Sequence, residues 1–264
     1  MERISIEVYE IVSHVLTLGF AAMGAALLYF ILTKNDNSPK YRPSSVLSVV
    51  VMVSAFLLLF LQYLSWSDAY VLSAAGDAYV LAEETRLFSN GYRYLNWLID
   101  VPMLLIQILF VAGITGAAFT KYLRNFAVTG VLMILTGYVG QFYEPGRANE
   151  NVTLWLLWGF ISTVFYIFVL VYITRVIKEG SANMKKSKGR PIFEFILPLF
   201  YVAWTIYPVA YVMPAFIEQL GYGTAIASQQ VLYTIADISS KVIYGVLLNI
   251  VSTILSKEQG FEGV

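Results

Sequence analysis

Four charged side chains interrupt stretches of the sequence that are otherwise apolar. Arg93 and Asp100 lie in one such stretch, and Asp237 and Lys241 lie in the last one. Ionisable residues are costly inside a membrane and usually mark a functional path. The alternative is that the two cations and two anions pair off as structural ion pairs. A functional role for the four charges is favoured over structural pairing, because each pair belongs to a larger polar set at helical spacing.

The first set is a stripe of four polar residues: Arg93, Asn96, Asp100 and Gln107. Successive members are three, four and seven residues apart, so a helix of 3.6 residues per turn places them on one face. At about 1.5 Å per residue the stripe extends about 21 Å, which is most of the thickness of a bilayer core. It predicts a polar ladder across a membrane.

The second set contains the candidate reactive residue. Tyr233, Asp237, Lys241 and Gly245 recur every four residues, so they share a helical face. Burial disfavours the ammonium form of a lysine, and a neutral lysine amine can condense with an aldehyde to form a Schiff base. Once protonated, that group is a buried cation. Asp100 and Asp237 are the carboxylates at a suitable depth to balance it.

Membrane-spanning helices must position these residues. The chain of 264 residues is 58% hydrophobic and 13% charged, whereas about 25% of residues are charged in an average soluble domain. A spanning helix needs about 20 mostly apolar residues. Seven stretches qualify: 7–33, 46–66, 92–116, 124–143, 152–178, 193–217 and 226–256. We expect one domain over residues 1–264, an all-α membrane protein with seven transmembrane helices and a short β-hairpin within residues 67–90.

Basic residues orient this bundle. With the N-terminus outside, twelve lysines and arginines fall in inner segments, whereas Arg3, Arg86 and Arg147 fall in outer ones. This asymmetry predicts an outer N-terminus and an inner C-terminus. The same rule accounts for the basic cluster at residues 185–190.

Composition excludes several other functions. The net charge of zero gives no electrostatic attraction to nucleic acid. The absence of cysteine and the single histidine exclude thiolate chemistry and a multi-histidine metal site. We find no nucleophile–histidine–acid set, so an enzyme is not expected.

Two segments resemble the microbial (type 1) rhodopsins, in particular their sodium-pumping branch. They are residues 93–102 (RYLNWLIDVP) and 233–241 (YTIADISSK), and the resemblance extends over essentially the whole chain. It implies all-trans retinal bound covalently to Lys241, with Asp100 and Asp237 as counter-charges and proton acceptors. It also implies a retinal pocket formed by Trp97, Trp204, Tyr207, Pro208, Tyr211, Gly159 and Ser162. Ordinary core packing is the alternative explanation for the aromatic members.

The polar stripe favours sodium over protons as the transported ion. In the family's outward proton pumps, carboxylates stand at the positions of Asn96 and Gln107, whereas amides do not titrate. The resemblance therefore implies a light-driven outward sodium pump that moves protons when sodium is scarce. Ser54 and Asn96 are expected to hydrogen-bond with Asp100. The implied pathway, with sodium held transiently near Asn96 and Asp237, is Ser48, Gln107, Ser54, Asn96, Asp237, Arg93, Gln62 and Glu144.

Some positions depart from the better-known sodium pumps. Gln229 replaces an arginine on the release side, and Arg86 replaces an aspartate of a surface cation site. Asn249 replaces a glycine at the inner end, which could alter ion entry and selectivity. Gly159 implies a window at which some relatives dock a carotenoid antenna. The alternative for Gly159 is a small residue that eases helix packing.

Other functions remain open. The same residues could serve a proton pump alone or a retinal photosensor that signals through a partner. A chloride pump is disfavoured, because it requires a neutral residue at the position of Asp100. An unrelated receptor would be indicated by absence of visible absorption with added retinal. The resemblance also implies a homo-oligomer, a pentamer, in the cell membrane of a bacterium, with sodium and the lipid bilayer as partners.

Overall fold

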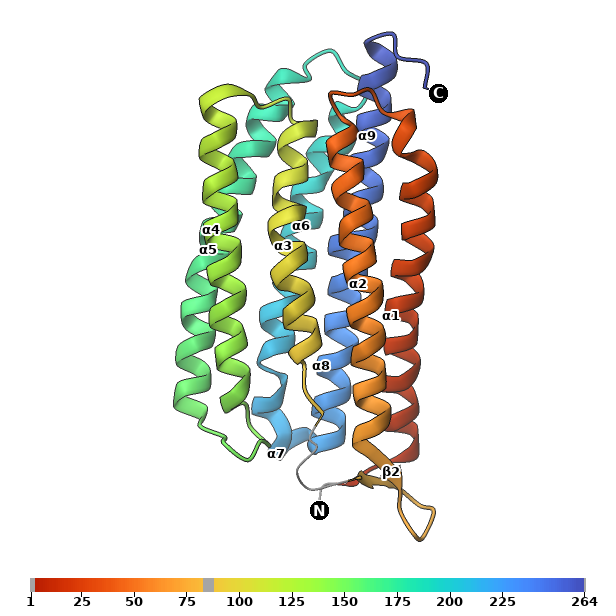
Figure 1. Ribbon diagram of the computed structural model, residues 1–264. Helices are drawn as coiled ribbons and strands as arrows, with labels where there is room; N and C mark the ends of the chain where they lie inside the picture. Colours follow the sequence, from red (N-terminus) through yellow and green to blue (C-terminus); the bar gives the residue numbers. More distant parts are fainter. Residues whose placement is uncertain (1–2, 83–87, 264) are drawn as a thin grey trace.

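Seven membrane-spanning helices form an up-and-down bundle (Figure 1). The computed structural model describes residues 3–82 and 88–263, so Arg86 lies outside the described residues. Within them, seven helices are long and apolar enough to cross a membrane, as predicted. The spans are α1 (Ile6–Thr33), α2 (Arg42–Ala69), α3 (Gly91–Val111), α4 (Gly116–Gly140), α5 (Val152–Asn183), α6 (Arg190–Tyr211), and α8 (Tyr222–Asp237) with its continuation α9 (Tyr244–Glu258).

Several helix ends differ from the predicted ones. Helix α3 ends at Val111 rather than at residue 116, because Gly113 and Gly116 adopt φ values of +65° and +61°, which suit glycine. Helix α4 begins at Gly116 rather than at residue 124. Its first turns carry Lys121, whose long side chain can reach water while its stem lies against the helix. Helix α6 ends at Tyr211 rather than at residue 217.

After α6, the chain turns through two short elements before the last span. They are the 3-10 turn η3 (Met213–Phe216) and α7 (Ile217–Leu220). Two further 3-10 turns, η1 (Lys34–Asp36) and η2 (Gln141–Tyr143), extend α1 and α4.

A small sheet covers the outer end of the bundle. The predicted hairpin is confirmed, with β2 (Tyr70–Leu72) antiparallel to β3 (Tyr79–Leu81). A third strand, β1 (Arg3–Ile4), was not predicted, and it pairs with the other side of β3 in the order β1-β3-β2. The side chain of Ile4 is buried there in a cluster with Trp66 and Phe88. The N-terminus is thereby tied to the α2–α3 connection.

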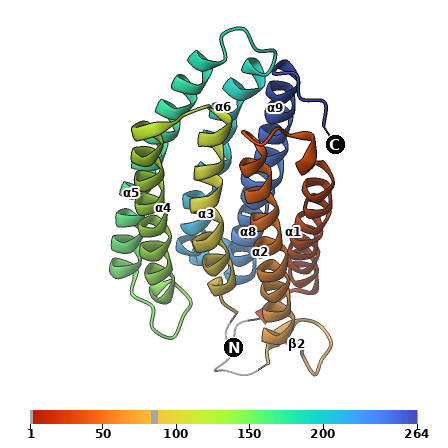
Figure 2. The same ribbon diagram turned by 45° about the horizontal axis from the view of Figure 1, so that its top comes forward.

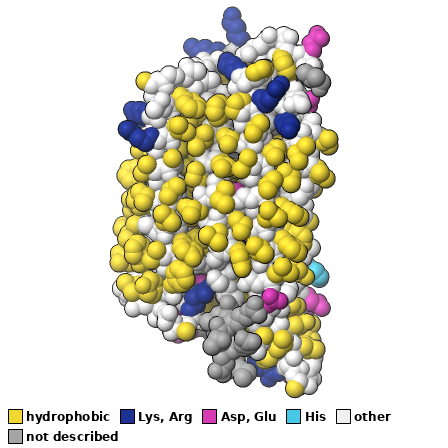
Figure 3. Space-filling view, in the orientation of Figure 1, with side chains coloured by type: hydrophobic (Ala, Val, Ile, Leu, Met, Phe, Trp, Pro, Cys, Tyr) yellow, Lys and Arg dark blue, Asp and Glu magenta, His cyan; other side chains and the backbone are white. Residues whose placement is uncertain are grey.

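The outer surface of the bundle is apolar over most of its height. Figure 3 shows hydrophobic side chains around the middle, with lysines and arginines gathered at the end where α9 finishes. Large apolar side chains point outward there, including Leu32, Phe160 and Val202, which are 78%, 67% and 66% exposed. Such a surface fits a lipid environment. Together with the seven spans it indicates a multi-pass membrane protein.

Helix α3 and the last span carry the candidate site into the core. Twelve residues of α3 are buried, among them Arg93, Asn96, Asp100 and Gln107. The last span is interrupted by a π-helical turn, Ile238–Ile243, which contains Lys241. Such π turns within α-helices frequently occur at functional sites. Figure 2 shows the end of α9 and the α5–α6 connection at the same end of the molecule, which the distribution of basic residues predicts to be the inner one.

Candidate functional site

The four intramembrane charges meet around the Lys241 amine. Its Nζ lies 3.2 Å from Asp100 Oδ2 and 3.0 Å from Asp237 Oδ1. It also donates a short hydrogen bond to Asn96 Oδ1. The side chains of Lys241, Asp100 and Asp237 have no solvent exposure. An ammonium has three hydrogens to donate, and here three acceptors surround it.

Asp237 is the more heavily engaged of the two carboxylates. Its Oδ2 forms an ion pair with Arg93 at 2.6 Å, and Arg93 also donates to Thr234 Oγ1 at 2.9 Å. Its Oδ1 accepts hydrogen bonds from Trp97 Nε1 and Tyr207 hydroxyl, each at 2.9 Å. Several donors to one buried carboxylate stabilise its ionised form. Asp237 is thus a well-held anion on the outer side of the lysine.

Asp100 is held more loosely. Its Oδ2 accepts a hydrogen bond from Asn96 Nδ2 at 2.6 Å, as predicted. Its Oδ1 is buried and has no hydrogen-bond partner among the described residues. The expectation that Ser54 also bonds to Asp100 was wrong: the Ser54 hydroxyl accepts from Asn96 Nδ2, at 3.1 Å, and reaches Asp100 only through that amide. A carboxylate with an unused oxygen is the better proton acceptor of the two.

The polar ladder continues inward after an apolar interruption. Leu104 is 1% exposed and lies between Asp100 and Gln107 along α3. Gln107 Oε1 accepts a hydrogen bond from Ser48 Oγ at 3.0 Å, and Gln107 Nε2 has no partner among the described residues. The predicted contact between these two inner residues is present, and it is separated from the lysine cluster by apolar packing.

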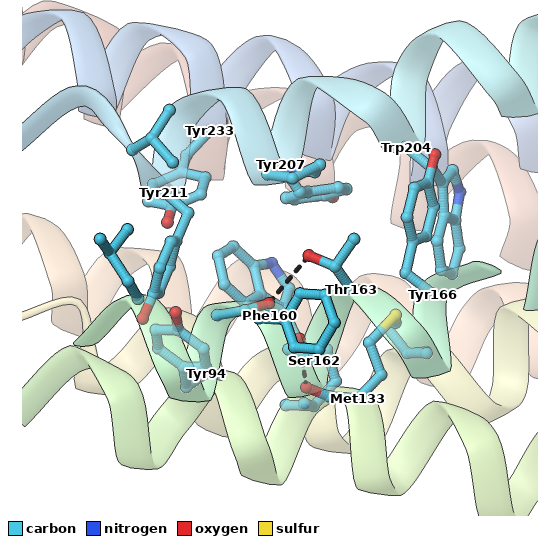
Figure 4. A pocket seen from close by; sticks show the side chains of 18 residues that line it. Tyr94, Met133, Phe160, Ser162, Thr163, Tyr166, Trp204, Tyr207, Tyr211 and Tyr233 are labelled. Atoms are coloured by element: carbon cyan, nitrogen blue, oxygen red, sulfur yellow. Dashed lines mark hydrogen bonds between the residues drawn. The ribbon is translucent and has the colours of Figure 1, made fainter. Parts of the chain in front are cut away.

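An apolar cavity of about 310 Å³ lies beside the cluster, between α3, α4, α5 and α6. Every residue predicted to surround the chromophore lines it: Trp97, Trp204, Tyr207, Pro208, Tyr211, Gly159 and Ser162. Figure 4 shows Tyr211 and Tyr233 toward one end of the cavity, and Trp204 and Tyr166 toward the other. The volume is at the lower end of the range of about 300–1,000 Å³ found for small-molecule sites.

Comparison with known proteins settles the family. A family model described as bacteriorhodopsin-like protein matches residues 10–255. The chain belongs to this family of microbial rhodopsins. Bacteriorhodopsin-II of Haloarcula marismortui is 28% identical over 156 residues, which cover 59% of this rhodopsin and 57% of that protein. The rhodopsin therefore matches a little over half of the length of that relative.

Solved structures resemble the whole rhodopsin. The crystal structure of a thermophilic rhodopsin is 28% identical, with a TM-score of 0.85, and the match covers 99% of this chain and 100% of that one. Xanthorhodopsin, described as a light-driven ion pump with dual chromophore, is also 28% identical with a TM-score of 0.85, covering 99% of each chain. The seven-helix fold is therefore shared along the full length.

Membership of the family implies a retinal chromophore, and the described residues fit one. The cavity is lined by aromatic and aliphatic side chains, which suits an apolar polyene. Trp97 and Tyr207 form its wall and donate to Asp237, the carboxylate that also contacts the Lys241 amine. The reactive nitrogen therefore stands directly behind the cavity wall. Lys241 itself does not line the cavity.

Gly159 makes room for Tyr211 in this rhodopsin. A Cβ at Gly159 would lie 2.7 Å from Tyr211 Cε1, which is closer than real contacts allow. The Tyr211 ring stacks on Trp155 at 5.2 Å between centroids, and its hydroxyl donates to the Trp155 carbonyl at 2.9 Å. This geometry supports the packing explanation for Gly159. A carotenoid at the same place remains a prediction.

The inner end of the rhodopsin is closed by a network centred on Asn249. Its Oδ1 accepts from Asn37 Nδ2 at 2.7 Å and from Ser45 Oγ at 2.9 Å. Its Nδ2 donates to Tyr29 hydroxyl at 3.1 Å and Thr33 Oγ1 at 3.0 Å. All four hydrogen-bonding positions of the amide are used. The spacing along the last span placed Asn249 at this end but gave no sign of its partners, which come from α1, α2 and their connection.

The outer end contains a second network, around Glu144. Its Oε1 accepts from Gln229 Nε2 at 2.6 Å, and its Oε2 pairs with Arg147 Nε at 3.3 Å. Arg147 also donates to the Phe88 carbonyl at 3.4 Å. Burial raises the pKa of Glu144, while Arg147 and the hydrogen bond from Gln229 lower it in part. Sequence reasoning named Glu144 and Gln229 but missed Arg147, which counts in the sequence as an ordinary outer arginine.

Gln62, also predicted on the exit path, belongs to the same outer end. Its Nε2 donates to the Ser89 carbonyl at 2.9 Å, and its Oε1 has no partner among the described residues. The neighbouring Asn90 bonds to Gln229 and Gln230 at 3.0 and 2.9 Å. Residues 88–90 therefore connect Gln62 with the Glu144 network.

Proposed function

We propose that this rhodopsin is a light-driven outward sodium pump with all-trans retinal bound covalently to Lys241, and that it moves protons when sodium is scarce. The observation that carries the proposal is the contact of the Lys241 amine with both Asn96 and Asp100. The residue nearest the amine on the stripe is thus a non-titrating amide, and the proton acceptor is one turn further inward. The description of xanthorhodopsin as a light-driven ion pump supports the transport class.

When bound, retinal supplies light absorption and an isomerisation that changes the surroundings of the Lys241 nitrogen. Before illumination, that nitrogen is a cation in a buried site, and like charges repel strongly in low dielectric. It therefore blocks the passage of another cation between the inner and outer halves of the ladder. Arg93, paired with Asp237 at 2.6 Å, adds a second positive charge further out.

Transfer of the proton to Asp100 removes this block. Asp100 Oδ2 is 3.2 Å from Nζ, and its Oδ1 is free to receive a hydrogen. After transfer, the lysine nitrogen and Asp100 are both neutral, so the repulsion is lifted. Sodium is a hard ion that prefers oxygen ligands. The amide oxygen of Asn96, released from its hydrogen bond with the Lys241 nitrogen, and Asp237 can then hold it transiently.

Return of the proton from Asp100 restores the barrier behind the ion. The positive charge on the nitrogen again repels any cation coming back from outside. Entry takes place past Ser48 and Gln107, and exit past Arg93 toward Gln62 and Glu144. Opening of the Asn249 network is required for entry, because that network ties α1, α2 and α9 together at the inner end.

The test is light-driven transport in cells that express the protein with retinal. External pH is recorded in sodium chloride and in potassium chloride, each with and without a protonophore. A sodium pump makes the medium alkaline in sodium, and the protonophore enhances the change because protons enter passively to balance sodium leaving. Acidification in both salts that the protonophore abolishes would show a proton pump instead. No light-dependent flux in either salt, together with visible absorption, would favour a photosensor.

The assembly and location are also proposals. We propose a homo-oligomer, a pentamer, in the cell membrane of a bacterium, supported by the resemblance to the sodium-pumping branch. Native mass spectrometry of the protein extracted with retinal measures the oligomer directly. Five copies per particle are expected, and a stable monomer or trimer would contradict the proposal.

A further inference from the structure

A second cavity lies at the inner end of the bundle, apart from the aromatic one. Its volume is about 470 Å³. Four parts of the chain meet around it: the end of α3 at Val111, the α1–α2 connection at Tyr41, the α5–α6 connection at residues 183–188, and the end of α9 at Glu258. Neither the polar ladder nor the proposed transport steps use this space.

The cavity carries an excess of positive charge. Lys40, Lys186 and Lys188 line it, and Glu258 is the one acidic residue among the described residues that line it. Three cations and one anion leave a formal charge of +2. Glu258 Oε1 accepts a hydrogen bond from the backbone N–H of Lys188 at 2.8 Å. In the part of the chain that the structure describes, none of the three ammonium groups forms an ion pair.

Neutral donors supplement the lysines. Tyr41 is 3% exposed and lines the cavity, and its hydroxyl accepts from Gln259 Nε2 at 2.8 Å. The hydroxyl of Ser187, another lining residue, accepts from the Gly189 N–H at 3.0 Å. Neither hydroxyl donates to an acceptor within the described residues, so each keeps a hydrogen to offer. Tyr41 is the buried one of the two, and a buried donor without an acceptor is unfavourable, so a bound acceptor would relieve it.

We propose that this cavity binds a phosphate group. A phosphate brings negative charge and several acceptor oxygens to a place that has positive charge and unused donors. Lysine ammonium groups bind phosphates as point charges. Basic pockets between membrane helices on the inner side are known to bind phosphate headgroups, and a concave site of one sign concentrates counter-ions. The phosphate comes from free inorganic phosphate or from the headgroup of an anionic lipid. The site does not depend on which ion the protein transports.

Binding is measured on the full-length protein in nanodiscs made of phosphatidylcholine alone. Inorganic phosphate is added at constant ionic strength with chloride as the replaced anion, and binding is followed by isothermal titration calorimetry. Saturable binding is expected. Each lining lysine near the surface contributes about fivefold to affinity, so K186Q weakens binding about fivefold and the triple variant K40Q/K186Q/K188Q about 100-fold.

A matched control removes the same charge from the same end of the molecule. Lys121, Lys178 and Lys185 are exposed on that side and do not line the cavity. The variant K121Q/K178Q/K185Q should bind phosphate as the unaltered protein does. Circular dichroism shows whether each variant is folded. If the triple lining variant does not fold, two single variants replace the triple ones. The phosphate affinity of K186Q, in which a lining lysine is changed, is then compared with that of K185Q, in which a non-lining lysine is changed.

A second titration separates the two sources of phosphate. Nanodiscs containing phosphatidylglycerol present the headgroup to the same site. An apparent affinity for inorganic phosphate at least tenfold lower there identifies the lipid headgroup as the occupant, because the two compete. Unchanged affinity identifies free phosphate. The proposal is overturned if binding is not saturable in phosphatidylcholine, or if the control variant loses as much affinity as the lining variant.

Discussion

Asp100 contacts the Lys241 amine through one carboxylate oxygen, at 3.2 Å, while its other oxygen has no polar partner among the described residues. Asp237, 3.0 Å from the same amine, is held in addition by Arg93, Trp97 and Tyr207. The two carboxylates therefore differ in what they can do. The saturated one stays an anion, and the other is available for a proton.

Asp100→Asn should abolish the proton transfer while leaving the hydrogen bond to Asn96 possible. Loss of a positioned proton acceptor usually slows a step by about 10²–10⁴-fold, so light-driven current in sodium-loaded vesicles should fall to near background. The exposed Asp36 provides the control, since D36N removes a carboxylate from the surface. Normal current in D100N would assign the proton to another group.

Lys241→Ala should prevent covalent attachment of retinal. Purified protein mixed with retinal is expected to show only the absorption of the free aldehyde, whereas the unaltered protein shows a red-shifted visible band. Lys257→Ala, at an exposed position near the end of α9, should keep the band. A visible band that survives in K241A, and that resists denaturation and extraction, would place the attachment at a different amine.

Asn249→Ala should open the inner end of the bundle. It removes four hydrogen bonds worth about 0.5–1.5 kcal/mol each, so we expect a loss of about 2–6 kcal/mol in the free energy of unfolding and a lower Tm. We also expect the potassium-to-sodium ratio of pump currents to rise, because the closure on the entry side is weakened. Ser252→Ala is the matched control, because the Ser252 Oγ is buried on the same helix without a hydrogen-bond donor role. Equal ratios in N249A and S252A would exclude Asn249 from selectivity.

Arg147→Gln should raise the pKa of Glu144 further. Burial already raises this pKa, and the Arg147 cation opposes that rise. The carbonyl band of protonated Glu144 in infrared difference spectra should therefore disappear at a higher pH in R147Q. Arg3→Gln, which breaks an exposed pair with Asp77, should leave the band unchanged.

The same carboxyl gives a stability trend with a definite sign. Because its folded-state pKa is raised, the folded protein binds more protons than the unfolded one above the ordinary value of about 4.5. Glu144 therefore lowers the free energy of unfolding as pH rises from about 4.5 through its raised pKa. Glu144→Gln should remove this slope, which Tm measurements over that range can detect.

Gly159→Ala should displace the Tyr211 ring. The added Cβ would lie 2.7 Å from Tyr211 Cε1, so the ring must shift and its hydrogen bond to the Trp155 carbonyl must lengthen. We expect a shifted visible band and a lower Tm. Leu157→Ala, at an outward-facing position on α5 that is 49% exposed and does not line the cavity, tests for a general effect of altering α5. If G159A has the same visible band and the same Tm as the unaltered protein, the position of the Tyr211 ring does not depend on the glycine.

The polar ladder and the chromophore pocket could be predicted because they follow from helical spacing. Arg93, Asp100 and Gln107 share a face of α3 by their intervals alone, and the structure buries all three. The resemblance to rhodopsins placed the pocket residues, which line one cavity.

The networks at the two ends could not be predicted, because they depend on contacts between distant segments. Asn37 is 212 residues from Asn249 in sequence, and no local period relates them. Arg147 joins Glu144 by a turn whose shape depends on how α4 and α5 are connected. Strand β1 is two residues long, too short for an alternating pattern.

The π-helical turn at Ile238–Ile243 divides the last span into two α-helical segments, α8 and α9. The direction in which the face of one segment points is set independently of the other. Each residue of an α-helix advances the chain by about 100°. Loss of Val242 or Ile243, which follow Lys241 in the turn, would thus rotate α9 by about that angle relative to α8, carrying Asn249 off the face that meets Asn37 while leaving Asp237 beside Arg93. The number of residues in this turn therefore sets the rotation of α9 about the helix axis relative to α8. Natural variants that differ in length after Lys241 in this turn would need compensating changes at the inner end.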